Sequence, residues 1–491
     1  MAPGMGIKPP AHRTKTGCLT CRKRKVKCDE EKPDCFRCRR LLMKCIWSEE
    51  VLEARARQQQ QAAMNGGAVN SLVRRTSSIP TISSDTQTFI TEFPNADRFS
   101  VPYLHHFTSF CSRFLAYPND AEGNPFQQEL VPLAAQSPAL LYAMSALAAG
   151  HMARGQPKHT MAAMKYYTMA LRELNTTLED PAKVRLSSTL GTCLLLCVYE
   201  ISHSDENLWF RHLQGARDLI LHRGGPKTSD FLVRFFSLLD ISGSLLTGKG
   251  PLISGNYWLD EEENGASHTK LRNWPYYDDN AIMVDNFHSL MVHMARLSNL
   301  SADSMTDFGK RNADLIEKRA MQIRHDLFEW WNTRPPNIRD QSNNWRRARP
   351  DLTLAEKLEE ESFSSTRSVV YGCIIYLHHI IDPYGLKPQA QEVADAIKGI
   401  LDISRETPEG LGLEMGLFFG LFMAGVAIFD DLESEILIRT KLANDANITI
   451  YHADSGLELL EALWAKQRQY NVKYDWREVQ KEMKLQVFIF A

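Results

Sequence analysis

Six cysteines near the N-terminus are the residues of this chain best suited to chemistry. They are separated by two, six, six, two and six residues, so a unit of two-then-six repeats with a period of 17. The six are Cys18, Cys21, Cys28, Cys35, Cys38 and Cys45. Thiolates at such spacing are typical ligands of structural zinc. A disulfide framework is the alternative, but it is typical of secreted domains, and no apolar stretch typical of a signal peptide follows the first basic residues.

Coordination chemistry sets the number of zinc ions that six thiolates can hold. Zinc in structural sites takes four ligands, at about 2.3 Å from each sulfur, so one ion would leave two thiols unused. Two ions need eight ligand positions, which six thiolates supply if two sulfurs bridge both metals. The spacing leaves open which two cysteines bridge. Because a module of about 30 residues cannot bury a sufficient core, we expect bound zinc to fold this segment.

Positive charge is concentrated in the same segment. Residues 13–44 contain twelve Lys and Arg against four Asp and Glu, a local charge of +8, and the net charge of −2 leaves −10 for the remainder. Five basic side chains lie between the second and third cysteines: Arg22, Lys23, Arg24, Lys25 and Lys27. A short helix after Cys18 would carry them into the major groove of double-stranded DNA, where Arg and Lys pair best with guanine. The basic run is also typical of nuclear import signals.

Taken together, the six cysteines, the basic run and Pro33 in the loop between the two halves resemble the fungal binuclear zinc cluster (Zn2Cys6) family. The resemblance implies two zinc ions with Cys18 and Cys35 as bridging ligands. Cys21 and Cys28 would then complete one zinc site, and Cys38 and Cys45 the other.

The same resemblance implies a function. It implies a sequence-specific regulator of RNA polymerase II genes that acts in the nucleus and recognises CGG-like triplets. Arg24 and Lys25, the third and fourth residues after the second cysteine, would read the bases. Arg22, Lys23 and Lys27 would serve mostly as contacts to the DNA backbone.

Composition divides the chain into four expected parts. These are a disordered N-terminus at 1–14, the Zn2Cys6 DNA-binding domain at 15–47, a flexible linker at 48–88 and a helical regulatory domain at 89–491. The linker is rich in Gln, Ala, Gly and Ser. It lacks three clean heptads, so a coiled coil is not expected there, and a homodimer formed by another route stays open.

After residue 89 the apolar residues recur with helical periodicity almost throughout, and no alternation indicates a sheet. The expected helices are Tyr103–Leu115, Leu140–Met152, Met161–Leu178, Leu186–Ile201, Trp209–Leu221, Ile282–Leu297, Asn312–Trp331, Leu354–Ile381, Glu392–Ile403, Met415–Phe429, Glu433–Leu442, Gly456–Gln469 and Arg477–Phe488, with an irregular stretch at Lys249–Asn280. We therefore predict a large all-α helical array. The most apolar helix, with 15 residues, is too short for a membrane span, so we expect it in the core and expect no membrane partner.

This helical body resembles the fungal-specific transcription factor domain. The resemblance is carried by Leu194–Glu200, Trp209–Ile220, Arg223–Gly225 and Asp475-Trp476. It implies a regulatory and interaction role, with coregulators as partners, and assigns no small-molecule effector.

Two other classes of function fit the sequence less well. Residues 430–434 are similar to the aspartate-rich motif of terpene synthases, but Ser434 replaces the last carboxylate and Asn444-Asp445 lacks the second metal motif, so no enzyme is expected. A metal-handling or redox-sensing protein would not require the basic run. The remaining cysteines are expected to be buried and unreactive, and His105-His106 and His378-His379 to be ordinary helical residues.

Overall fold

The computed structural model describes the chain as two units, Met1–Thr81 and Ile82–Ala491. The described residues are 18, 20, 97, 99–115, 124–203, 208–226, 230–253, 279–334, 336–339, 354–407, 415–443 and 454–485. Only Cys18 and Thr20 belong to the first unit, so the fold described below is that of the second. Within the described residues 82% are helical and none is in a strand, which confirms the all-α prediction.

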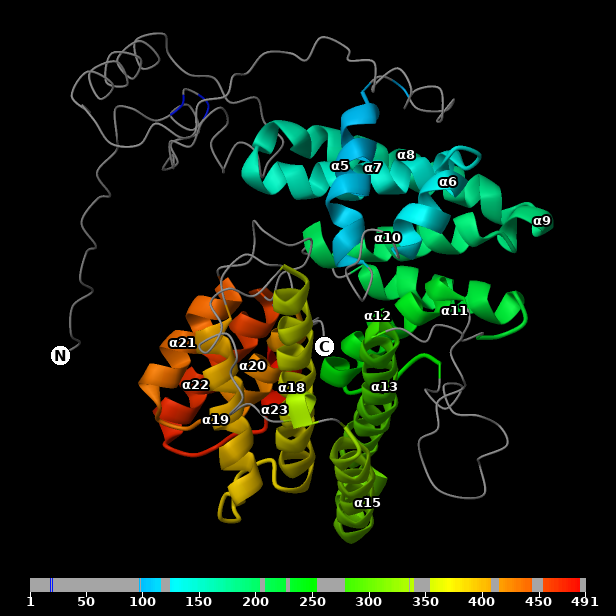
Figure 1. Ribbon diagram of the computed structural model, residues 1–491. Helices are drawn as coiled ribbons and strands as arrows, with labels where there is room; N and C mark the ends of the chain where they lie inside the picture. The colour runs from blue at the N-terminus through cyan, green and yellow to red at the C-terminus, as the bar shows by residue number, and fades with distance from the viewer. Residues whose placement is uncertain are drawn as a thin grey trace, which may run out of the picture. The chain divides into compact units, whose positions relative to one another are not determined.

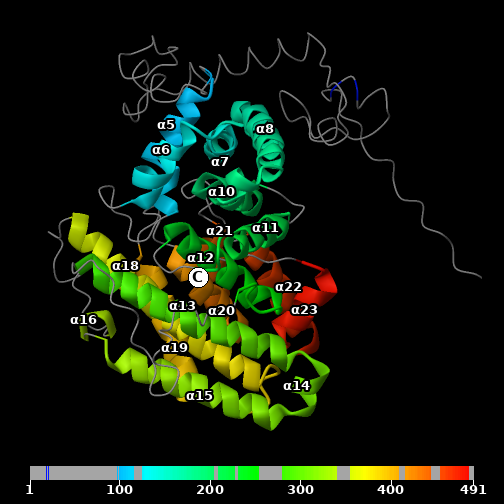
Figure 2. The ribbon, with the colours of Figure 1, turned by 90° about the vertical axis from the view of Figure 1, so that its right-hand side faces the viewer.

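The helices of the second unit form two groups that follow one another along the chain (Figures 1 and 2). The first group is α5 (Val101–Ser109), η1 (Cys111–Phe114), η2 (Phe126–Leu130), α6 (Val131–Ala134), α7 (Pro138–Gly155), η3 (Pro157–His159), α8 (Thr160–Leu178), α9 (Pro181–Val184), α10 (Ser187–His203), α11 (Trp209–His222) and α12 (Phe231–Thr247). The second group is α13 (Asp279–Ser304), α14 (Asp307–Arg311), α15 (Ala313–Asn332), α16 (Pro336–Arg339), α18 (Leu354–Ile381), α19 (Gln391–Glu406), α20 (Met415–Ala427), α21 (Leu432–Ala443), α22 (Asp454–Tyr470) and α23 (Trp476–Met483).

Small side chains let α7 lie close to its neighbours. The hydroxyl of Ser137 accepts from the backbone N–H of Leu140 and begins α7, with Pro138 at its first position. Along the helix, Ala146 and Ala149 are fully buried against α8 and α10. This group of helices encloses the first apolar cluster, which extends from α5 to α12.

Two glycines set the packing in the second apolar cluster, where α18, α19 and α20 pack against one another. A Cβ on Gly420 of α20 would come within 2.1 Å of the Ser368 hydroxyl on α18, and a Cβ on Gly372 within 2.8 Å of the Phe419 ring. The two backbones can approach closely because neither glycine carries a side chain. From Leu417 to Val426, α20 is buried on all sides, as expected of a core helix. None of the described helices is long and apolar enough to cross a membrane.

Helix α12 belongs to both clusters. Its first half, Phe231 to Leu239, packs in the first cluster, whereas Ile241, Leu245 and Leu246 pack in the second. Asp230 caps its N-terminus through the backbone N–H of Leu232, and the left-handed Gly248 ends it. The sequence analysis missed this helix, although Asp230 before it and Gly248 after it are ordinary signals for the start and the end of a helix.

Several boundaries differ from the predicted ones. The expected helix Arg477–Phe488 ends at Met483, because Lys484 adopts a left-handed conformation with φ of 55°. Helix α13 begins at Asp279, at the end of the predicted irregular stretch Lys249–Asn280. Residues 254–278 of that stretch lie outside the described residues. The proposed boundary at residue 89 and the linker at 48–88 lie outside them as well.

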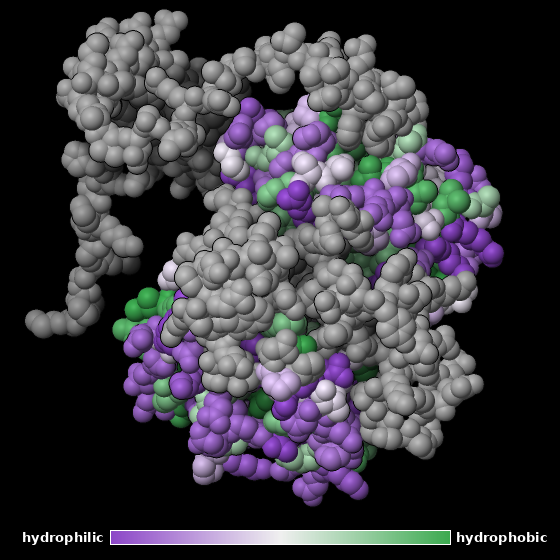
Figure 3. Space-filling model, viewed as in Figure 1, coloured by the Kyte–Doolittle hydropathy of each residue, from purple (hydrophilic) through white to green (hydrophobic). Residues whose placement is uncertain are grey.

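The described surface carries its large exposed apolar residues singly or in short helical pairs, such as Met161 with Met164 on α8. On the face shown in Figure 3, most of the coloured surface is hydrophilic and the hydrophobic areas are small. Among exposed apolar side chains, Leu386 is 85% and Met161 75% exposed, but they lie on different helical groups. Scattered exposed apolar residues of this kind are ordinary for a folded domain.

Candidate metal centre and nucleic-acid interface

Cys18 is the one predicted zinc ligand among the described residues. Its side chain is fully buried, and Thr20 two residues later has helical backbone geometry. The sequence predicts a short helix at this point. A thiol withdrawn from water at the start of a helix is a suitable structural zinc ligand, since such sites are closed to solvent.

The other predicted residues of this site lie outside the described residues. The zinc ligands among them are Cys21, Cys28, Cys35, Cys38 and Cys45. The DNA-contacting residues are Arg22, Lys23, Arg24, Lys25 and Lys27. Their roles therefore stay predictions from the sequence.

The cysteines of the helical body are of another kind. Cys111, Cys193, Cys197 and Cys373 are all buried. Burial raises the pKa of each of them, for Cys193 to about 12. Because the thiolate is the form that attacks and that binds metal, these protonated thiols are poor nucleophiles and poor ligands. Their chemistry contrasts with that expected of the six N-terminal cysteines.

The paired histidines of α18 each contact a carboxylate on another helix. His378 lies against Glu392 of α19, and the same carboxylate also receives Arg324 of α15. His379 is bonded to Asp475 at 3.1 Å. The two side chains thus tie separate helices together and do not converge on one point. The pair His105-His106 on α5 separates likewise, with His105 exposed and His106 directed to His151 of α7.

The acidic run before α21 has a structural role. Asp431 accepts from the backbone N–H of Ser434 at 3.1 Å and from its hydroxyl at 2.6 Å, which caps the helix. Asp430 holds a left-handed turn with φ of 53°. This use of the carboxylates agrees with the expectation that the run is not a catalytic metal motif. The Asn444-Asp445 segment lies outside the described residues.

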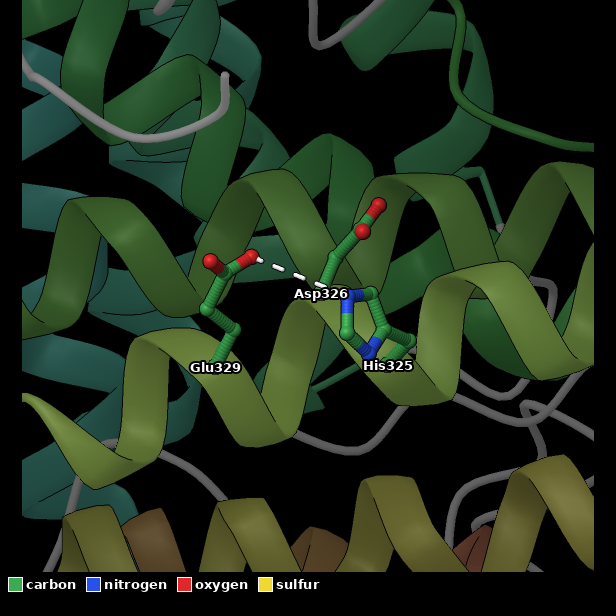
Figure 4. Close-up of side chains that lie close together, drawn as sticks. All are labelled: His325, Asp326 and Glu329. Carbon is green, nitrogen blue, oxygen red and sulfur yellow. Dashed lines mark ion pairs between the residues drawn. The ribbon is translucent and has the colours of Figure 1, made fainter.

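Three side chains on α15 form a group that the sequence analysis did not single out. Figure 4 shows His325 directed toward Glu329, with 4.0 Å between the ring nitrogen and the carboxylate. One ligand atom of each of the three side chains lies within 4.8 Å of the others. Asp326 is buried and bonded to Arg296 at 2.6 Å and to Gln322 at 2.8 Å. Because a guanidinium already neutralises this carboxylate, the group is better explained as a helix-to-helix ion pair than as a metal site.

The Arg223–Gly225 motif is a turn that joins three helices. Gly224 and Gly225 both have positive φ, of 104° and 90°, which favours glycine. The guanidinium of Arg223 donates to the hydroxyl of Ser187 and to the carboxylate of Asp230, each at 3.1 Å. The motif therefore connects the end of α11 to the starts of α10 and α12.

The Asp475-Trp476 motif begins α23 inside a buried polar network. Asp475 accepts from Arg477 and from His379, and Arg477 in turn donates to Ser301 of α13 at 3.1 Å. Burial alone would raise the pKa of Asp475, but the hydrogen bonds from His379 and Arg477 outweigh it and hold that pKa well below its usual range. The carboxylate is thus fixed in its charged form at the junction of α13, α18 and α23.

Comparison with known proteins accounts for both units of the chain. The fungal Zn(2)-Cys(6) binuclear cluster domain matches residues 16–53, which include all six N-terminal cysteines. The fungal specific transcription factor domain matches residues 102–490, nearly all of the helical body. No solved structure gives a significant match.

Individual relatives agree with these matches. The transcriptional activator protein UGA3 of Saccharomyces cerevisiae is 24% identical over 247 residues, which are 45% of this chain and 47% of that protein. The transcription activator AMTR1 of Alternaria alternata is 52% identical over 54 residues, 11% of this chain and 7% of its own. White-opaque regulator 2 of Candida albicans is 56% identical over 39 residues, 8% of this chain and 9% of its own.

In each case the match spans less than half the length of the relative. The family itself rests on the two domain matches, of which the larger covers most of the chain. Proteins of this kind bind zinc and DNA, act in the nucleus and are not enzymes. The chain belongs to the fungal zinc cluster transcription factors, with a binuclear cluster domain at its N-terminus and a fungal specific transcription factor domain as its helical body.

Proposed function

We propose that this chain regulates RNA polymerase II genes in the nucleus by binding CGG-like triplets. The binding part would be the zinc-folded DNA-binding domain at residues 15–47, called the head below. The observation that carries the proposal is the coincidence, within residues 16–53, of the cluster domain match, six cysteines in two equivalent halves and five basic side chains between two of them. The helical body then supplies regulation and contacts with coregulators.

Two zinc ions fit the donor set. Six thiols give eight ligand positions when two are shared, and the buried Cys18 provides a site closed to water. In the proposed arrangement Cys18 and Cys35 bridge the ions, Cys21 and Cys28 complete one site, and Cys38 and Cys45 complete the other. Zinc supplies the folding energy of the head, since a segment of this size has little apolar surface to bury.

The five basic residues divide into two roles. Arg24 and Lys25 would donate to guanine O6 and N7 in the major groove, which gives sequence preference. Arg22, Lys23 and Lys27 would neutralise phosphates, which gives affinity that falls with salt at a slope of about −0.9 per neutralised charge. Base preference and salt dependence are therefore carried by different side chains.

The test is selection of binding sites from random duplex DNA by the full-length, zinc-loaded chain, beside a chelated sample. We expect enrichment of CGG-like triplets that disappears on chelation, and the spacing of the recovered triplets would distinguish a monomer from a dimer. Lys25→Ala should keep zinc content and weaken binding by about 1–3 kcal/mol, with relaxed base preference. Lys27→Ala is the matched control, which should lower the salt slope and leave the preferred triplet unchanged.

Enrichment of unrelated sequences, or none that depends on zinc, would remove the CGG assignment. Normal binding of the preferred site by Lys25→Ala would remove the role given to that residue.

A further inference from the structure

Two histidines from different helices meet beside the first apolar cluster, under Phe110. Nε2 of His106 on α5 lies 3.0 Å from Nδ1 of His151 on α7, and the two rings stack with centroids 5.1 Å apart. Phe110 covers both rings, at 5.1 Å from His106 and 4.6 Å from His151. The other ring nitrogen of His151 is buried and has no hydrogen-bond partner. The pair is thus largely shielded from water.

A hydrogen bond between two imidazoles requires that one nitrogen donate and the other accept. A neutral pair meets this requirement, because each neutral ring carries one N–H and one free lone pair. When both rings are protonated, both facing nitrogens carry a hydrogen and both rings are cationic. The contact between α5 and α7 then changes from attractive to repulsive.

All the titratable and charged groups that act on the two histidines are basic. They are His105 on α5, Arg154 on α7, His159 of η3 and His203 at the end of α10. His159 is bonded to the hydroxyl of Tyr103 at 3.0 Å, and Arg154 donates to the carbonyl of Ser202 at 3.1 Å. Arg154 supplies a permanent positive charge beside the pair, to which protons on His106 or His151 would add.

Carboxylates near these helices are engaged elsewhere. Asp97, before α5, accepts from the backbone N–H of Ser100 and from Tyr166 of α8. Glu200 of α10 acts on His212 of α11 and on Tyr167 of α8. No carboxylate among the described residues is directed at the pair to compensate a second proton.

We propose that the His106–His151 pair is a proton-sensitive contact that holds α5 on α7 at neutral pH and releases α5 on acidification. This regulatory property is separate from DNA recognition by the head. It would let the acidity of the cell alter the surface that the helical body presents at its first helix.

The direction of the effect follows from linkage. Burial, and after it the neighbouring basic groups, lower the pKa of His151 to about 3, and the pKa of His106 is lowered by burial and by basic neighbours as well. In a released α5 each histidine returns toward its ordinary pKa of about 6.5. The released state thus binds more protons, so the attachment of α5 weakens as the pH falls below about 6.5. Between pH 7.5 and 5.5 one such histidine changes the release equilibrium by about tenfold.

The test is hydrogen exchange of the full-length chain at pH 7.5 and pH 5.5, corrected for the intrinsic pH dependence of exchange. We expect the protection of α5 amides to fall tenfold or more at pH 5.5, while α15 in the second cluster changes little. The double variant His106→Gln with His151→Asn keeps a donor and an acceptor at the positions of the two facing nitrogens but cannot bind the extra proton. It should lose the pH response. His325→Gln, at an exposed histidine of α15, is the control and should respond as the wild type does.

Equal protection of α5 at both pH values in the wild type would overturn the proposal, and so would a full pH response in the double variant. If the double variant fails to fold, the titration of imidazole carbon signals in the wild type decides. We expect His106 and His151 to stay neutral below the ordinary histidine pKa of about 6.5, as long as α5 remains attached. Titration of the pair near pH 6.5 in a chain with α5 attached would be equally contrary to it.

Discussion

The head and the helical body of this chain use the same residue types for opposite purposes. In the head, six cysteines within 28 residues are repeated at spacing suited to metal ligation. In the body, cysteines such as Cys193 and Cys373 are buried among apolar side chains, where burial raises the pKa of each thiol. The difference shows that the spacing of the cysteines and the residues around them decide whether a thiol is a ligand or a core residue. The residue type alone does not decide it.

Charge follows the same division. The head concentrates a charge of +8 between residues 13 and 44 with few acidic neighbours. The body pairs several of its buried charges, and Asp475 with Arg477 is the most enclosed of these ion pairs. Unpaired positive charge suits binding to a polyanion, whereas paired charge joins helices.

The largest effect that separates the two regions is the removal of zinc. Structural zinc contributes about 10–16 kcal/mol in small finger peptides near neutral pH. We expect chelation, or Cys21→Ala, to abolish folding of the head and DNA binding, while thermal unfolding of the helical body is unchanged. Zinc content by atomic emission and DNA binding by titration measure this. Cys193→Ala is the control and should keep both zinc and DNA binding. Loss of the body's helical signal on chelation would contradict the division drawn above.

A smaller effect tests the paired charges of the body. Asp475→Ala leaves Arg477 buried without its partner and removes the cap of α23, so the free energy of unfolding should fall by about 3–5 kcal/mol. Glu482→Ala removes an exposed pair with Lys466 nearby and should cost about 0–1 kcal/mol. Urea unfolding followed by circular dichroism compares the two variants.

The ion pair of Asp475 with Arg477 also makes the free energy of unfolding depend on pH. The pKa of Asp475 is lower in the folded chain than in the unfolded one. Its contribution is therefore complete above the unfolded pKa of about 3.9 and is lost as the pH falls below it. The deficit of Asp475→Ala relative to the wild type should shrink correspondingly at low pH, and a constant deficit would show that packing alone is involved.

The smallest effect concerns packing without charge. Gly420→Ala places a methyl group 2.1 Å from the Ser368 hydroxyl and 3.0 Å from its carbonyl oxygen. Overpacking costs about 1–3 kcal/mol and exceeds the gain in helix propensity of about 1 kcal/mol, so a net loss of up to about 2 kcal/mol is expected. In a Ser368→Ala background the loss should be smaller. Gly155→Ala, where nothing lies within 4 Å of the added atom, should be neutral or stabilising. Equal effects at the two glycines would exclude close packing as the cause.

How far the sequence predicted the body depended on the pattern of each helix. Amphipathic helices such as α8 and α11 were placed within a residue or two, because polar and apolar faces alternate along them. Helix α12 was missed although the equally buried α10 and α20 were predicted from their long apolar runs, and its start and end signals, Asp230 and Gly248, were present in the sequence. The end of α23 was predicted too far along the chain, because the helix ends at Met483 and no glycine or proline at the next position, Lys484, indicates it in the sequence.

The sequence also predicted the zinc site better than the polar contacts of the helical body. The zinc ligands were predicted because all six lie within one short, regular segment of the sequence. The contact between His106 and His151 joins residues 45 positions apart, and that between Arg477 and Ser301 joins residues 176 apart. Only the packing of helices brings such residues together, so periodicity within one helix gave no indication of them.

Because α12 belongs to both apolar clusters, it also affects the order in which the body is completed during synthesis. The first cluster has all its helices once residue 247 has left the ribosome. The second half of α12, with Ile241, Leu245 and Leu246, has no packing partners until α13 and the helices that follow it have been synthesised. During that interval an apolar surface stays uncovered on an otherwise finished structure, which is the kind of surface that chaperones bind and through which nascent chains aggregate.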